Sequence, residues 1–249
     1  ESVVKAIHQK DYVNRLKRLE LNRSEVRKIG FPISQQLVER EFIIAGGTLE
    51  GALISLQEGI SFNIAGGTHH AYSNRGEAFC MLNDQAIASR YLLDHQHAKK
   101  ILIIDLDVHQ GNGTAEIFNT EDRVFTFSIH GQKNYPFKKE QSDWDIPLED
   151  KTGDDVYLNV LNDTLPRLFE RVDPDFVFYI SGVDVLATDR LGRLGMSLEG
   201  CKQRDEQVLE FCHKRSLPIQ CSMGGGYSKD IKLIIEAHAN TYRVAQRIF

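Results

Sequence analysis

Asp105, Asp107 and His109 are the residues whose types and spacing most clearly indicate chemistry in this chain. They alternate with Leu106 and Val108, and alternate side chains of an extended segment project to the same side. Two carboxylates and an imidazole gathered there need a cation or a proton to offset their charge. Zinc accepts mixed carboxylate and imidazole ligands, and a set without cysteine is typical of an open catalytic site. The alternative interpretation is an exposed acidic turn.

Asp184 is the candidate for a third metal ligand, because a catalytic zinc ion usually has three protein ligands and one open position. It follows the apolar segment Phe176–Ile180, whereas Asp173 and Asp175 precede that segment and would lie at the wrong end of a strand. The alternative is a helix cap or a turn, which are the commoner roles of an Asp after a strand.

His69 and His70 follow a Gly66-Gly67 pair, in which a turn would let both imidazoles point inward. Imidazoles suit general acid–base catalysis near neutral pH. A pair of metal ligands or two surface histidines are the alternatives.

Tyr227 follows three glycines, Gly224, Gly225 and Gly226. A flexible backbone there would let the tyrosine hydroxyl reach the site and donate to a developing oxyanion. A phosphate-binding loop is the weaker alternative, since the GxGxxG spacing and the GK[ST] ending are absent. A plain loop before the last helix is the other alternative.

The elements that must position these residues are short apolar strands alternating with amphipathic helices. Strands that are apolar throughout are expected in a parallel sheet covered on both faces, and the helices between them predict right-handed crossovers. Ligands of such sheets bind beyond the carboxyl ends of the strands. The four groups of polar residues described above all follow expected strands and therefore lie at those ends. We expect strands at Phe62–Ile64, Ile101–Leu106, Val124–Ile129, Phe176–Ser181 and Ile219–Met223. We expect helices at Thr48–Glu58, Asn83–His95, Asp154–Arg171, Leu198–Lys214 and Ser228–Ile248.

No repeat, low-complexity tract or linker divides the chain, so we expect one α/β domain over residues 1–249. Gly131–Thr152 has no clear period and is predicted to be a surface loop over the site. The net charge of −5 and the absence of a long Lys/Arg run argue against nucleic acid as a partner. The densest basic stretch, residues 15–28, is diluted by acids and is interpreted as a solvated helix face.

Other sequence features bear on the cellular environment. No apolar run approaches the roughly 18–20 residues of a membrane span, so no membrane partner is expected. The four cysteines show no paired spacing, which predicts buried thiols in a reducing compartment. There is no signal-peptide pattern, and we expect a cytoplasmic protein.

Taken together, these motifs resemble those of the zinc-dependent histone deacetylase family, which includes bacterial acetoin-utilisation proteins and acetylpolyamine amidohydrolases. The matching stretches occur in the family's order and cover most of the chain. Gln110 and Asn112 are most similar to the class IV and related bacterial branch. The stretches are Gly66–Ala71 (GGTHHA), Gly76–Asp84 (GEAFCMLND), Asp105–Gly113 (DLDVHQGNG), Ser181–Asp184 (SGVD) and Gly224–Tyr227 (GGGY).

The resemblance implies an arginase/deacetylase-like central parallel sheet with helices on both faces, and one zinc ion per chain. The residues matching zinc ligands are Asp107, His109 and Asp184. Those matching the catalytic groups are the tandem histidines His69 and His70, Asp105 beside the first histidine, the carbonyl-polarising Tyr227, and Asn112. Those matching the substrate tunnel are Phe79, Gly225 and Gly226. A potassium ion is implied near Ser128 and the backbone of Asp105, Asp107 and His109.

In the mechanism that the resemblance implies, His70 takes the proton of a zinc-activated water and later protonates the amine, while His69 gives electrostatic support. Many members have His-Gly-Asp where this chain has Gln110-Gly111-Asn112, so the expected partner of His70 is a neutral amide. A neutral partner stabilises an imidazolium less, which favours His70 as a base. The family also begins with a strand and loop upstream of this sequence, which indicates a truncated or incompletely covered chain.

The implied substrate is an acetyl-lysine protein or peptide, an acetylated polyamine or another small acylated amine. Two alternatives stay open. An arginase-type hydrolase would share the fold but need further carboxylates to bridge two manganese ions. A non-catalytic acyl-lysine binding module would have the cavity without the chemistry, although such a module would be expected to have lost Tyr227 and His70.

Overall fold

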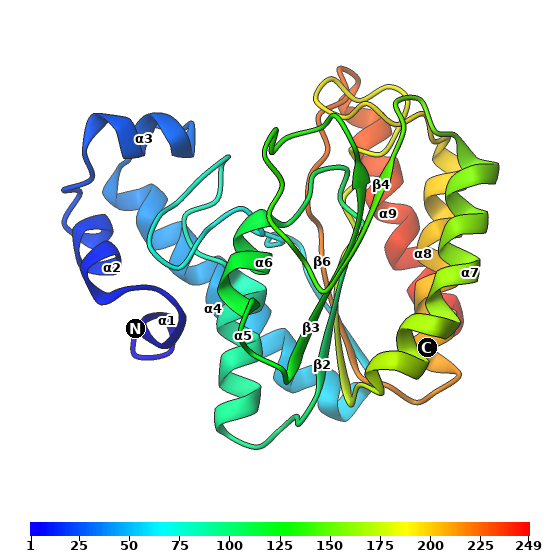
Figure 1. The fold of residues 1–249 in the computed structure, drawn as a ribbon, viewed down its shortest axis with the longest axis horizontal. Helices are drawn as coiled ribbons and strands as arrows, with labels where there is room; N and C mark the ends of the chain where they lie inside the picture. Colours follow the sequence, from blue (N-terminus) through cyan, green and yellow to red (C-terminus); the bar gives the residue numbers. More distant parts are fainter.

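A six-stranded parallel sheet lies at the centre of residues 1–249, all of which the computed structural model describes (Figure 1). The strands follow one another across the sheet in the order β1-β6-β5-β2-β3-β4, and every neighbouring pair is parallel. Their bounds are Ile60–Asn63 (β1), Ile101–Asp105 (β2), Val124–Gly131 (β3), Trp144–Leu148 (β4), Phe176–Ile180 (β5) and Ile219–Ser222 (β6).

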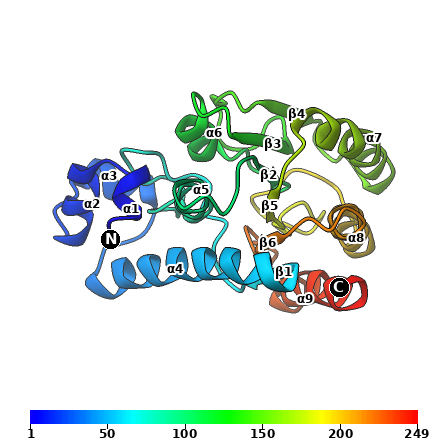
Figure 2. The same cartoon turned by 90° about the horizontal axis from the view of Figure 1, so that it is seen from below.

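Helices cover both faces of the sheet, as Figure 2 shows. One face carries α4 (Gln35–Glu58), α5 (Asp84–Asp94) and α6 (Asn112–Phe118), and the other carries α7 (Asp154–Val172), α8 (Leu198–His213) and α9 (Ile231–Ile248). Three short helices, α1 (Val4–Ile7), α2 (Lys10–Lys17) and α3 (Arg23–Ile29), pack beside α4 and α5. The predicted fold class is therefore confirmed.

The first four residues of the central strand β2 are apolar because side chains on both faces of this strand are buried. Ile101 and Ile103 pack into a core with α4 and α5, while Leu102 and Ile104 pack into the core formed by α7, α8 and α9. All four side chains are at most 1% exposed. Burying a side chain of this size stabilises the fold by about 1.5–3 kcal/mol relative to leaving it in water.

Two of the expected elements need correction. The predicted loop Gly131–Thr152 contains β4, a half-buried edge strand whose Pro147 and polar residues hide the strand pattern. The helix predicted at Thr48–Glu58 begins at Gln35, capped by Ser34, and runs through Gly46-Gly47, a pair with low helix propensity. The short helices α1 and α6 were not predicted, and the basic stretch at residues 15–28, interpreted as one helix face, is divided between the end of α2 and α3.

The parallel arrangement brings the ends of β2, β5 and β6 to one edge of the sheet. Asp105 lies in register with Ile180 of β5 on one side and with Ser128 of β3 on the other. Ser222 of β6 lies beside Ile180. The polar segments that follow these strands therefore meet, although they are far apart in the sequence. None of the helices combines the length and apolar character that crossing a membrane requires.

Candidate active site

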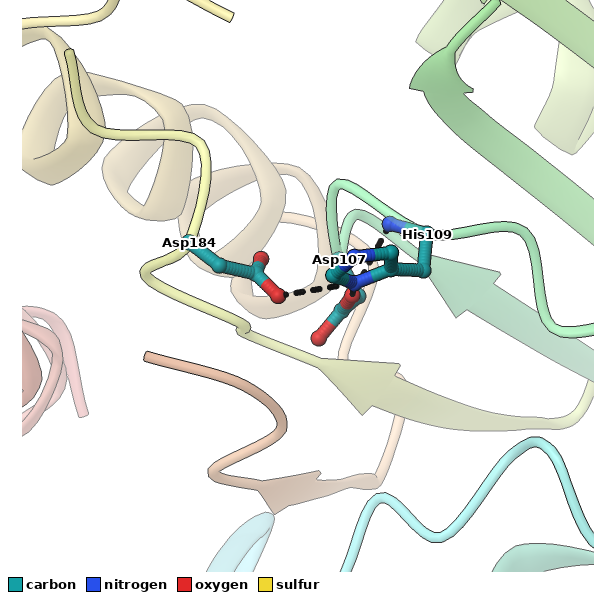
Figure 3. A group of neighbouring side chains, drawn as sticks. All are labelled: Asp107, His109 and Asp184. Atoms are coloured by element: carbon teal, nitrogen blue, oxygen red, sulfur yellow. Dashed lines mark hydrogen bonds and ion pairs between the residues drawn. The ribbon is translucent and has the colours of Figure 1, made fainter. Parts of the chain in front are cut away.

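Asp107 and His109 follow β2, Asp184 follows the adjacent strand β5, and the three side chains converge (Figure 3). One potential ligand atom from each lies within 4.8 Å of the others, and all three residues are buried. Nδ1 of His109 is 3.0 Å from Oδ1 of Asp107 and 3.1 Å from Oδ2 of Asp184. The structure thus brings together the three residues that the sequence proposed as metal ligands.

Backbone N–H groups orient both carboxylates. Gly225 donates to Oδ2 of Asp107 at 2.7 Å, and Val108 donates to Oδ1 of Asp184 at 2.9 Å. Each carboxylate therefore keeps its other oxygen directed at His109. A Cβ atom at position 225 would lie 2.2 Å from Oδ2 of Asp184, so only glycine fits there.

The charges of this group call for a positive partner. Burial raises the pKa of Asp184 to about 7, and the neighbouring charge of Asp107 adds to this shift. Burial opposes protonation of His109, yet its hydrogen bonds to Asp107 and Asp184 raise its pKa to about 10. A divalent cation bound by two carboxylates and one imidazole would supply the positive charge in place of that proton. The donor set therefore fits a metal ion such as zinc.

The two adjacent histidines point their Nε2 atoms at each other, 3.1 Å apart. Nδ1 of His69 lies 2.6 Å from Oδ2 of Asp105, and Nδ1 of His70 lies 2.6 Å from Oδ1 of Asn112. Because a carboxylate and an amide carbonyl only accept, both Nδ1 atoms donate. The contact between His70 and Asn112 is the one expected from the sequence.

The partners give the two imidazoles opposite protonation. Burial alone would lower the pKa of His69, but the carboxylates of Asp105 and Asp107 outweigh it and raise the pKa to about 9. Burial lowers the pKa of His70 well below its ordinary value, and the positive charges of His69 and His109 lower it further. At neutral pH His69 is charged, whereas His70 is neutral with Nε2 unprotonated. His70 can therefore accept a proton.

Tyr227 and Phe79 line the cavity above this group, which has a volume of about 830 Å³. The ring of Tyr227 lies 6.5 Å from the His109 ring and 6.3 Å from the Phe79 ring, measured between centroids. Burial and the charges of Asp107 and Asp184 raise the pKa of Tyr227, so its hydroxyl stays protonated and can donate.

The loop that carries Tyr227 is packed tightly enough to require its glycines. A Cβ at Gly226 would lie 2.7 Å from Cγ2 of Val183, and Gly224 has a φ of +69°. Asp189 accepts the backbone N–H of Tyr227 at 2.6 Å and holds this end of the loop. Tyr227 is thus placed by its backbone.

Residues 1–242 match the histone deacetylase domain in a comparison with protein families. The chain belongs to the histone deacetylase family. It is 42% identical to an uncharacterized protein of Picosynechococcus over 243 residues, which are 98% of this chain and 81% of that protein. It is 30% identical to histone deacetylase 2 of Arabidopsis thaliana, covering 92% of this chain and 62% of the relative. It is 31% identical to histone deacetylase 1 of Homo sapiens, with 79% and 42% covered. The chain thus spans less than two thirds of these two histone deacetylases.

Two site residues of this histone deacetylase family member escaped the sequence analysis because only folding brings them to Asn112. The amide nitrogen of Asn112 donates to the hydroxyl of Tyr72 at 3.0 Å, and that hydroxyl donates to Oε1 of Glu140 at 3.2 Å. These bonds set the orientation of the amide, so its oxygen faces His70. Tyr72 lies close to the histidine pair in sequence, but nothing in the sequence marked Glu140.

Asp84 fixes the turn that carries the histidines. It accepts the backbone N–H groups of Gly67 and Thr68 at 3.1 and 2.9 Å, and the hydroxyl of Thr48 at 2.6 Å. Gly67 adopts a φ of +76°, which explains the glycine. The sequence analysis included Asp84 in a family motif without a role. Its position beside the helix-capping Asn83 was the available signal.

Tyr135 is a further wall of the cavity that the sequence analysis missed. Its ring lies edge-on to His70, with 5.1 Å between the centroids, and its hydroxyl bonds to Glu77. It follows the end of β3 by a few residues, inside the segment expected to be a loop over the site. Tyr135 therefore restricts access of solvent to the imidazole.

Ser128 lies beside Asp105, as the potassium prediction requires, but no further feature of the structure tests that ion. Ser128 is the register partner of Asp105, and its hydroxyl oxygen lies 3.0 Å from Nδ1 of His130. The potassium ion therefore stays a prediction.

Proposed function

We propose that this chain hydrolyses the amide of an acylated, typically acetylated, lysine or lysine-like amine with the help of one zinc ion. The observation that carries the proposal is the position of His70, which Asn112 holds at 2.6 Å and whose ring centroid lies 5.9 Å from that of His109 in the buried Asp107, His109 and Asp184 group. The family membership supports the same reaction class.

Asp107, His109 and Asp184 would hold the metal ion, whose chemistry is to polarise a carbonyl oxygen and to lower the pKa of a water molecule. Nε2 of His70 accepts a proton from the attacking water. The resulting imidazolium then returns the proton to the amine nitrogen as the amide bond breaks.

His69 and Tyr227 act on the charges that the reaction develops. The His69 imidazolium, paired with Asp105 at 2.6 Å, adds a fixed positive charge beside His70. The Tyr227 hydroxyl donates to the oxygen that becomes negative in the tetrahedral intermediate. Phe79 and Gly225 line the cavity that would receive the acyl amine, whereas Gly226, also expected there from the sequence, packs against Val183 outside the cavity lining.

A turnover panel tests this function. Acetyl-lysine peptides, longer-chain acyl-lysine peptides and an acetylated polyamine are incubated with protein of known metal content, with and without a chelator. We expect release of the free amine and carboxylate that stops on chelation and returns with added zinc. Turnover that persists after complete metal removal would refute the metal-dependent mechanism.

The same samples distinguish the two alternatives. An arginase-type site would bind two metal ions per chain, whereas the structure has one group of three converging ligands. A binding module would hold an acyl-lysine peptide without releasing product.

Potassium is tested by comparing thermal unfolding in potassium chloride with that in lithium chloride, and we expect the higher Tm in potassium chloride.

A further inference from the structure

The cavity that contains Tyr227 and His70 is lined by six positively charged side chains, called here the basic rim. Only two acidic residues, Glu41 and the buried Asp107, line the same cavity. The whole chain carries a net charge of −5, so the rim has the opposite sign to the protein that bears it. The basic rim consists of Arg27, Lys28, Arg40, Lys133, Arg190 and Arg193.

The basic rim is assembled from segments that are distant in sequence. Arg27 and Lys28 end α3, and Arg40 lies in α4. Lys133 follows β3, whereas Arg190 and Arg193 lie in the long connection between β5 and α8. The positive charge of the rim therefore comes from several separate segments and not from a single basic stretch of sequence.

Backbone hydrogen bonds tie these segments to the walls of the cavity. The carbonyl of Lys28 accepts the N–H of Ala78, next to Phe79. The N–H of Arg193 donates to Oδ1 of Asn134, which adjoins Tyr135. The rim is thus held in place relative to the aromatic residues of the site.

The protein neutralises only part of the rim. Arg193 and Lys133 share Asp150, at 2.7 and 4.0 Å, and Arg40 contacts Glu41 at 3.0 Å. The side chains of Arg27, Lys28 and Arg190 take part in no ion pair of the structure. All six residues are exposed, so their charges face a ligand that approaches the cavity.

Charges of one sign around a cleft attract ligands of the opposite sign and repel those of the same sign. At 0.1 M salt the screening length is about 10 Å, comparable to the distance between a substrate side chain and its flanking residues. An acetylated polyamine or a Lys/Arg-rich peptide would bring further cations to this rim. A carboxylate beside the acylated amine would instead find partners there.

We propose that the natural substrate is an acyl-lysine flanked by carboxylates, as in an acidic peptide segment, and that the basic rim selects it. The proposal rests on the proposed function and names the substrate class of that same site.

Three acetyl-lysine peptides of equal length, flanked by Asp, Ser or Lys residues, test the selection. We expect kcat/KM to be greatest for the acidic peptide and smallest for the basic one, through KM and not kcat. Each exposed charge pair contributes up to about fivefold in affinity, so two pairs predict a range of up to about 25-fold. The range should shrink at high salt. Acetylspermidine should be a poorer substrate than the neutral peptide.

Charge reversal identifies the rim as the cause. The double variant Arg27→Glu/Arg190→Glu should lose or invert the preference. The matched control, Lys99→Glu, lies before β2 at the opposite end of the sheet and should keep the preference. Equal kcat/KM for the three peptides, or an unchanged preference in the double variant, would overturn the proposal.

Two further arms complete the test. Free Nε-acetyl-lysine is compared with its α-amide, and a preference for the free acid would show that the α-carboxylate of a small molecule suffices. The dissociation constants of the three peptides are also measured on Tyr227→Phe protein. A graded affinity without turnover in the parent protein would refute the proposed function and support the substrate class. Equal affinities would refute the substrate class alone.

Discussion

At the scale of single residues, the different partners of His69 and His70 support the proposal that His70 is the base. The amide oxygen of Asn112 lies 2.6 Å from Nδ1 of His70, holding the ring without offsetting a positive charge. Burial and the charges of His69 and His109 therefore keep the pKa of His70 well below its ordinary value, while the carboxylates of Asp105 and Asp107 outweigh burial and raise the pKa of His69. One neutral and one charged imidazole thus result from two different partners.

Replacing Asn112 with Asp tests this assignment. The carboxylate favours the imidazolium form and raises the pKa of His70, by about one unit or more for an anion at this distance. Since a base must be neutral to act, the acidic limb of the kcat/KM profile should move to higher pH by a similar amount. The profile is measured at matched zinc occupancy.

The control for this variant is Asn119→Asp, which adds the same charge at the exposed end of α6. Its profile should stay where the parent's is. If the limb of the Asn112→Asp protein also stays in place, Asn112 does not tune His70.

Tyr227→Phe removes the proposed oxyanion donor. The fold should be unaffected, because the Tyr227 hydroxyl makes no hydrogen bond within the protein. Turnover should fall by roughly 10²–10³ while zinc content remains normal. Tyr242→Phe removes another tyrosine hydroxyl, one that is buried without a partner, and should leave turnover unaffected. Nearly full activity in the Tyr227 variant would exclude it as the donor.

Asp184→Ala tests the metal site directly. The variant lacks one of three ligands and leaves the N–H of Val108 without its acceptor. We expect most of the zinc to be lost from the purified protein, as measured by elemental analysis. An Asp189→Ala protein, altered in a residue that contacts only the Tyr227 loop and its neighbours, should keep its zinc. Stoichiometric zinc in the Asp184 variant would show that Asp184 is not a zinc ligand.

At the scale of elements, α8 fixes the loops that carry the proposed metal ligands. Arg204 of this helix is fully buried and donates to the carbonyls of Leu106 at 3.1 Å and Gly182 at 2.6 Å. Each carbonyl lies within two residues of a proposed ligand. The charge of Arg204 is balanced by Asp205 at 2.7 Å, which also accepts from Thr241 of α9. Helix packing on one face of the sheet therefore sets the geometry at its edge.

Arg204→Met should destabilise the protein strongly, because it leaves a buried carboxylate without its cation and removes the donor to the three carbonyls of Leu106, Ser181 and Gly182. Breaking a buried pair in this way costs about 3–5 kcal/mol. The free energy of unfolding in urea measures the loss. Arg243→Met breaks an exposed pair with Glu236 and should cost less than about 1 kcal/mol. A comparable, small loss in both variants would contradict the proposed role of Arg204.

At the scale of the whole molecule, buried neutral histidines make the stability depend on pH. Nε2 of His8 accepts the N–H of Asn83 at 2.9 Å, so it cannot hold a proton without breaking that bond. Burial lowers the pKa of His8 to about 4, and burial lowers those of His130 and His238 to about 4 as well. In the unfolded chain these three histidines have ordinary pKa values of about 6.5. Between pH values of about 4 and about 6.5 they therefore bind more protons in the unfolded chain than in the folded one.

His8 alone should therefore lower the free energy of unfolding by up to about 3 kcal/mol as the pH drops from about 6.5 to about 4, whereas Glu41 and Asp184, whose pKa values burial raises to about 7, change the stability in the opposite direction. Urea unfolding at several pH values measures this dependence. A His8→Gln protein should show a shallower slope across the same range, whereas replacing the exposed His213 should leave the slope unchanged. An identical slope in the His8 variant would contradict the assignment.

Much of the framework could be predicted from local pattern. Continuous apolar runs such as residues 101–104 of β2 occur where both faces of a strand are buried, so they predicted a parallel sheet. The alternation of Asp105, Asp107 and His109 at the end of that run likewise predicted a ligand group, because neighbouring side chains share one backbone. The edge strand β4 was missed because it buries only part of its surface and carries a proline.

The sequence alone determined the sheet, its ligand-bearing edge and the candidate chemistry of each short motif. Only the tertiary structure decided which motifs act on one another, since Asp107 meets Gly225 across 118 residues and Tyr72 meets Glu140 across 68. The basic rim and the anchoring of the loops by Arg204 also exist only after folding. Local patterns report burial and periodicity, whereas contacts between distant segments depend on how whole elements pack.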